Sequence, residues 1–139
     1  MRILITGCSG YIGSCLSNYL NENKEIFFLD KDFPKKFTKI KKNFFKCNLN
    51  NLKKTEAIIG KIKPNVIVHL AAKSTVNEKI KKNDYILNNI IATKNLIKVM
   101  NKLNIRNIIF SSTAAVYDKS RKLLKENYIL KPISNYGKS

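Results

Sequence analysis

The 139-residue sequence contains no tryptophan, one histidine, three prolines, five glycines and only nine acidic residues. No apolar run approaches the roughly 18 residues that a membrane-spanning helix needs, and the glycine-rich segment starts too early for a signal peptide. The three cysteines, Cys8, Cys15 and Cys47, form no C-x-x-C pair. Their odd number is typical of free thiols in a reducing compartment and does not favour a disulfide or a metal site. The sequence therefore predicts one cytoplasmic domain, or part of one, without a metal.

The few acidic residues stand against 27 lysines and arginines, which gives a formal net charge of +18. A domain this basic is a candidate for binding nucleic acid. However, the lysines are scattered over most segments, and Lys, Asn and Ile share codons rich in adenine and thymine. The basic groups at 79–82 and 119–125 also lack the interleaved aromatic side chains of single-stranded nucleic-acid sites, and only the group at 35–42 has phenylalanines nearby. We interpret the charge as solvated surface and keep nucleic-acid binding as an alternative.

Three of the five glycines lie between the apolar residues 3–5 and a helical pattern. Gly7 suits the tight turn from strand to helix, Gly10 a close approach by a pyrophosphate, and Gly13 the packing of the helix against the strand. The next strand ends at Asp30, about 20 residues further on, where a carboxylate accepts from the adenosine ribose of a dinucleotide. Lys31 beside it leaves some room for NADP.

Strands alternate with helices along the chain. Apolar runs predict strands at 2–6, 26–29, 44–45, 66–70 and 107–111, and helical spacing predicts helices at 11–23, 49–62 and 85–103. Asn48 or Asn50 is the expected cap of the second helix, and the lysine-rich stretch around Pro34 is expected to be a loop. This order predicts an α/β fold with a doubly wound, Rossmann-like parallel sheet, whose strand ends form one ligand crevice. His69, inside the fourth strand, is predicted to be a core residue.

Five segments of the sequence occur together and in order: TGCSGYIGS, VIVHLAAKSTV, NNIIATKNLI, FSSTAAVY and PISNYGKS. With them the chain resembles the extended short-chain dehydrogenase/reductase family of NAD-dependent epimerases and dehydratases, most closely its UDP-glucose 4-epimerases. The resemblance implies NAD as the cofactor, and it assigns contacts with NAD to Gly7, Gly10, Tyr11, Ile12, Gly13, Asp30, Asn48, Leu49, Leu70, Ala71, Ala72, Ser74 and Asn88. Asn89 is the competing choice for Asn88. Asn48 stands where the family has an acidic residue facing adenine, and its amide oxygen is expected to accept from the adenine amino group without charge assistance.

The resemblance also implies a reaction. Thr113 and Tyr136 match the family's catalytic hydroxyl and phenol, which would act on a UDP-hexose through a 4-keto intermediate. Dehydratases carry an acidic pair after the active-site Thr, whereas this chain has Ala114 and Ala115. The sequence therefore favours epimerisation, with another dehydratase or reductase of nucleotide sugars as the alternative.

The family's catalytic Lys would come directly after Ser139, the last residue. We therefore expect the N-terminal part of a longer enzyme, without the C-terminal substrate region and inactive alone, arising from a truncated gene product or an incomplete sequence. The full-length protein is expected to be a homodimer that does not bind membranes. A basic nucleic-acid-binding fragment and an unstable remnant with an unpaired sheet edge are the competing hypotheses.

Overall fold

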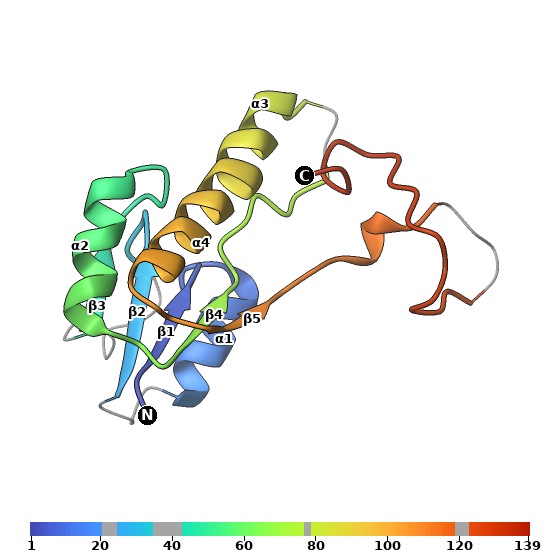
Figure 1. Ribbon diagram of the computed structural model, residues 1–139. Helices are drawn as coiled ribbons and strands as arrows, with labels where there is room; N and C mark the ends of the chain where they lie inside the picture. The colour runs from blue at the N-terminus through green and yellow to red at the C-terminus, as the bar shows by residue number, and fades with distance from the viewer. Residues whose placement is uncertain (21–24, 35–42, 77–78, 119–122) are drawn as a thin grey trace.

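The computed structural model describes residues 1–20, 25–34, 43–76, 79–118 and 123–139. Five parallel strands form one sheet in the order β3-β2-β1-β4-β5 (Figure 1). The strands are β1 (Ile3–Thr6), β2 (Ile26–Asp30), β3 (Phe44–Lys46), β4 (Val66–His69) and β5 (Asn107–Phe110). The helices are α1 (Tyr11–Leu20), α2 (Leu52–Ile62), α3 (Lys82–Tyr85), the π-helix η2 (Ile86–Ile91), α4 (Ala92–Lys102) and the short 3-10 helix η3 (Ala114–Val116). The predicted parallel, doubly wound sheet is confirmed.

Helices cover both faces of the sheet. Successive side chains of a strand point to opposite faces, so Leu4 and Ile5 of β1 enter different apolar clusters. Leu4 packs with α2 and α4, which lie side by side on one face, while Ile5 packs towards α1 on the other (Figure 1). This burial on both faces explains why the central strands are continuous apolar runs in the sequence.

Two helices begin or continue differently from the prediction. Helix α2 begins at Leu52 rather than 49, because residues 48–51 form a turn in which Asn51 donates its N–H to the Asn48 carbonyl. Its cap is Asn51, whose side-chain oxygen accepts from Lys54 N at 3.0 Å, so the predicted caps were wrong. The predicted helix at 85–103 exists, but it begins at Lys82 and contains the π-helical turn η2. The end of the first predicted helix and most of the lysine-rich loop, at 21–24 and 35–42, lie outside the described residues.

Strand β5 forms one edge of the sheet in the described parts of the chain; it pairs with β4 and has all four residues exposed. Ile109 and Phe110 are 59% and 57% exposed. After β5 the chain leaves the sheet, and its last residues return to η2, where Asn89 donates to the hydroxyl of Ser139 at 2.7 Å (Figure 1). The segment after β5 thus brings the end of the chain back to the carboxyl side of the sheet.

Candidate cofactor and active site

The glycine loop after β1 is held by backbone contacts that exclude larger residues. Gly7 has a φ of +74°, and a Cβ there would lie 2.4 Å from the nitrogen of Ala71. A Cβ on Gly13 would lie 2.1 Å from the Gly7 carbonyl oxygen. At Gly10 the nearest atom would be 3.4 Å away. The fold therefore requires Gly7 and Gly13, whereas the space beside Gly10 is open to a ligand.

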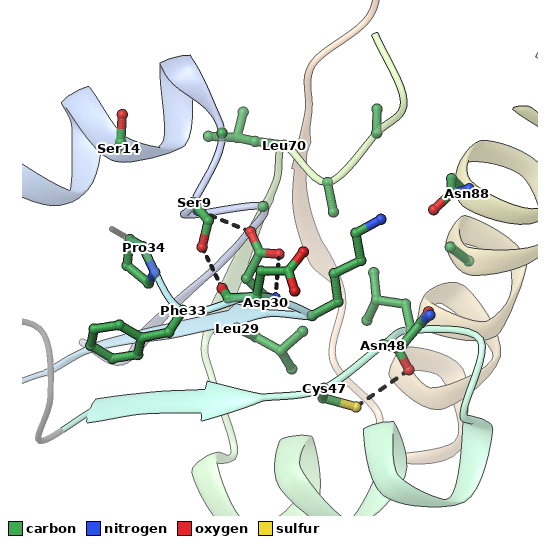
Figure 2. A pocket seen from close by; sticks show the side chains of 18 residues that line it. Ser9, Ser14, Leu29, Asp30, Phe33, Pro34, Cys47, Asn48, Leu70 and Asn88 are labelled. Atoms are coloured by element: carbon green, nitrogen blue, oxygen red, sulfur yellow. Dashed lines mark hydrogen bonds between the residues drawn. The ribbon is translucent and has the colours of Figure 1, made fainter. Parts of the chain in front are cut away.

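Asp30 is fixed by the loop that it faces. Its Oδ2 accepts from Ser9 N at 2.9 Å and its Oδ1 from Asp32 N at 3.3 Å, while the Ser9 hydroxyl donates to the Asp32 carbonyl at 2.6 Å (Figure 2). A carboxylate accepts several hydrogen bonds, so these bonds leave it able to accept from a ligand hydroxyl. The sequence analysis missed Ser9, although a small hydroxyl residue between two loop glycines is a visible signal.

Two adjoining cavities lie along the carboxyl ends of the strands. They share Gly7, Gly10, Leu70, Ala71 and Ala72, so they meet at the glycine loop and the turn after β4. The first, of about 560 Å³, extends towards β2 and β3 and is also lined by Asp30, Asn48, Leu49 and Asn88. The second, of about 580 Å³, extends towards β5 and is also lined by Tyr11, Ile12, Gly13, Ser74, Thr113 and Tyr136. Every residue assigned to the site from the sequence therefore lines one or both cavities; the role of each stays a prediction.

The side chain of Asn48 is oriented by its own loop. Its Oδ1 accepts from Asn50 N at 3.0 Å, an Asx turn that identifies the oxygen atom of the amide. The oxygen expected to serve the adenine amino group therefore already accepts one hydrogen bond, and its contact with adenine stays a prediction.

The two neighbouring asparagines of η2, Asn88 and Asn89, line different cavities. Asn88 lines the first cavity and donates to the Asp84 carbonyl of its own helix at 2.7 Å. Asn89 lines the second cavity and binds the loop after β4, accepting from Lys73 N at 2.7 Å and donating to Lys73 O at 3.3 Å. Both candidates for one position thus reach the crevice, and Asn89 also joins the loop after β4 to Ser139.

Thr113 and Tyr136 come from segments that pack closely. Thr113 Oγ1 accepts from Ala115 N at 3.1 Å, and its hydroxyl keeps a proton to donate. A Cβ on Gly137 would lie 2.2 Å from the Ala115 carbonyl oxygen, so a glycine next to Tyr136 permits this approach. The ring centroids of Tyr136 and Tyr85 lie 6.2 Å apart. The sequence analysis missed Gly137 and Tyr85.

Two buried titratable groups beside the cavities stay neutral at neutral pH. His69 is 2% exposed, and its Nδ1 and Nε2 share hydrogen bonds with Thr6 Oγ1 at 2.7 Å and Thr93 Oγ1 at 2.9 Å. Burial lowers the pKa of His69 to about 4, and the prediction that it is a core residue is confirmed. Burial, and then the charge of Asp30, raise the pKa of the Cys8 thiol to about 12. Cys8 is therefore an inert thiol beneath the glycine loop.

Among the described residues, no group of three His, Cys, Asp or Glu side chains could hold a metal ion. No helix in these parts of the chain is long and apolar enough to cross a membrane.

Comparison with known proteins identifies the family. The sequence model of the NAD dependent epimerase/dehydratase family matches residues 3–139. The chain belongs to this family. Among curated members of the epimerase/dehydratase family, the UDP-glucose 4-epimerase of Lactobacillus helveticus is 31% identical over 144 residues, which cover 100% of this chain and 44% of that protein.

Solved structures agree with this assignment. The UDP-Glc/GlcNAc 4-epimerase of Campylobacter jejuni superposes with a TM-score of 0.86 at 33% identity, over 99% of this chain and 45% of that one. The Thermus thermophilus UDP-glucose 4-epimerase, solved in complex with NAD, superposes with a TM-score of 0.86 at 25% identity, over 99% and 47%. The chain thus spans less than half the length of these members of the epimerase/dehydratase family.

Proposed function

We propose that this chain is the NAD-binding part of a nucleotide-sugar 4-epimerase that interconverts UDP-glucose and UDP-galactose. The observation that carries the proposal is the two-part cavity. It has the glycine loop at its centre, a carboxylate in one half and the hydroxyls of Thr113 and Tyr136 in the other. This division matches a dinucleotide with its pyrophosphate at the loop and a reacting ring beside the two hydroxyls.

The residues present fit NAD. Gly10 leaves space for a phosphate, and the N-terminus of α1 at Tyr11 directs unpaired N–H groups and a positive dipole end to that space. Asp30 is oriented to accept from the hydroxyls of the adenosine ribose, and its negative charge disfavours a 2′-phosphate at the same place. Leu49, Leu70 and Ala71 supply apolar walls to the first cavity.

The chemistry of the second half would be proton transfer at Tyr136, supported by a hydrogen bond from Thr113. NAD, when bound, supplies the acceptor that takes a hydride from the sugar and returns it. In its phenolate form, Tyr136 would take the proton of the sugar 4-hydroxyl and later return it. Thr113 would donate a hydrogen bond to the same sugar oxygen and keep its proton, since its oxygen already accepts from Ala115 N.

Epimerisation is favoured over dehydration by the lining of the second cavity. Eliminating water needs a group that protonates the leaving hydroxyl. None of the residues that line this cavity in the described part of the chain is acidic, and the residues after Thr113 are the alanines of η3.

The test is interconversion of UDP-glucose and UDP-galactose by the whole protein, together with NAD binding measured by calorimetry. Tyr136→Phe removes the proton-transferring hydroxyl and is expected to lower kcat at least about 100-fold while NAD still binds. Tyr19→Phe, at a tyrosine of α1 that is 87% exposed, is the matched control and is expected to keep full activity. The proposal fails if Tyr136→Phe retains wild-type kcat, or if the protein binds no NAD.

A cytoplasmic, homodimeric protein is the form we infer for the whole enzyme. The three free thiols support a reducing compartment. Ile91 on the long helical run is 36% exposed and lines neither cavity, which supports a helix that packs against a second copy. Equilibrium sedimentation of the whole protein tests the dimer.

A further inference from the structure

The first cavity contains a polar side chain whose hydrogen-bonding character is set by its loop. It lies past Asp30, where the carboxyl end of β3 follows that of β2 in the sheet, and Asn48 lines it there (Figure 2). With a ribose at Asp30, the base of a dinucleotide would extend to this end of the cavity. The inference below therefore rests on the proposed NAD site.

The loop that carries Asn48 is held in place by hydrogen bonds to its main-chain carbonyls. Asn51 N donates to the Asn48 carbonyl at 2.9 Å, and Cys47 Sγ donates to the same oxygen at 3.4 Å. Asn95 of α4 donates to the Leu49 carbonyl at 3.0 Å. With the main chain fixed, the side chain of Asn48 is fixed in turn by the bond from Asn50 N to its Oδ1. The arrangement is preorganised before any ligand arrives.

We propose that Asn48 makes the base subsite accept a 6-oxopurine at least as well as adenine. A carboxylate in this place would use one oxygen for Asn50 N and offer the second as an acceptor for a 6-amino group. In Asn48 an NH₂ group, which only donates, takes the position of that second oxygen. It opposes another donor, the 6-amino group of adenine, and matches the 6-oxo group of hypoxanthine.

Asn88, the other amide in the cavity, lies elsewhere along it. It precedes Asn95, the residue that anchors the Asn48 loop, by seven positions in one continuous helical run. At about 1.5 Å per residue this separation is roughly 10 Å along the helix axis. Asn88 is therefore displaced along the cavity from the Asn48 loop and does not replace Asn48 at the base.

The test compares the binding of two dinucleotides by calorimetry: NAD and nicotinamide hypoxanthine dinucleotide. The proteins are the full chain, its Asn48→Asp variant and Asn65→Asp as a matched control. Asn65 also accepts a backbone N–H through Oδ1, from Arg2 at 2.8 Å, but lies at the amino end of β4. The control thus reproduces the change in charge and the retained hydrogen bond without touching the cavity.

The full chain and Asn65→Asp are expected to bind the hypoxanthine dinucleotide as tightly as NAD or more tightly. Asn48→Asp is expected to shift the ratio of the two affinities at least tenfold towards NAD, since an acceptor replaces a donor at the base. A tenfold preference of the full chain for NAD, or a ratio that Asn48→Asp leaves unchanged, overturns the inference alone. Binding of neither dinucleotide by any of the three proteins overturns the proposed function as well.

Discussion

The glycine loop allows folding and ligand binding to be separated by one substitution, Gly10→Ala. The added Cβ would have no atom nearer than the Gly7 carbonyl oxygen at 3.4 Å, so the folded chain accommodates it. We expect the free energy of unfolding to change by less than about 1 kcal/mol. The same methyl group occupies the space through which a pyrophosphate would approach the N-terminus of α1. Losing one charge-assisted hydrogen bond there costs about 1.5–3 kcal/mol, so the affinity for NAD should fall at least about tenfold.

The assay pairs urea unfolding with calorimetric titration of NAD. Gly60→Ala is the control, because Gly60 lies inside α2 and its added Cβ would meet only Leu103 side-chain atoms, at 3.9 Å. This variant should bind NAD normally and gain about 0.5–1 kcal/mol from the helix preference of alanine. Equal NAD affinity in Gly10→Ala and Gly60→Ala would refute the placement of the phosphate. Unfolding of Gly10→Ala would refute the packing argument.

Three further predictions concern other residues of the site. Gly13→Ala places a Cβ 2.1 Å from the Gly7 carbonyl oxygen and should lower the urea-unfolding free energy by at least about 2 kcal/mol; an unchanged midpoint would contradict it. Gly137→Ala forces its segment away from Ala115 and should lower kcat of the whole enzyme at least about tenfold, with NAD affinity retained; a normal kcat would count against this packing. His69 is neutral when folded and protonates more readily when unfolded, so stability should be complete above pH 6.5 and fall as the pH drops towards 4. The loss approaches about 3 kcal/mol at 1.36 kcal/mol per pH unit, and urea titrations of His69→Gln should lack this slope.

The sequence predicted the central strands of the sheet well because they are buried on both faces. Residues 3–5 of β1 and 66–68 of β4 are uninterrupted apolar runs, so length and composition were enough to locate them. Boundaries that depend on side-chain capping were harder. Several asparagines stand between 48 and 51, and which of them caps α2 is decided by the turn that the loop adopts.

The residues that line the candidate site could be predicted from the sequence, but the orientation of their side chains could not. Motif spacing predicted that the assigned residues line one crevice, because the carboxyl ends of parallel strands meet at one edge of the sheet. The choice between Asn88 and Asn89 could not be made from a period of 3.6, since η2 is a π-helix with a wider turn. The direction of the Asn48 amide depends on one backbone N–H two residues away, which no periodicity encodes.

The helical run α3-η2-α4 fixes the distance between the two ends of the site. Asn95 holds the loop of the first cavity, and Asn89, six residues earlier, holds Ser139 and the segment of Tyr136. At about 1.5 Å per residue these two attachments are roughly 9 Å apart along one rigid element. Deleting one residue of α4 between Ala92 and Lys94 would turn Asn89 by about 100° away from its partners while Asn95 kept its own. The length of this helical run, rather than any one side chain, therefore sets the spacing between the proposed base subsite and the proposed catalytic segment of Tyr136.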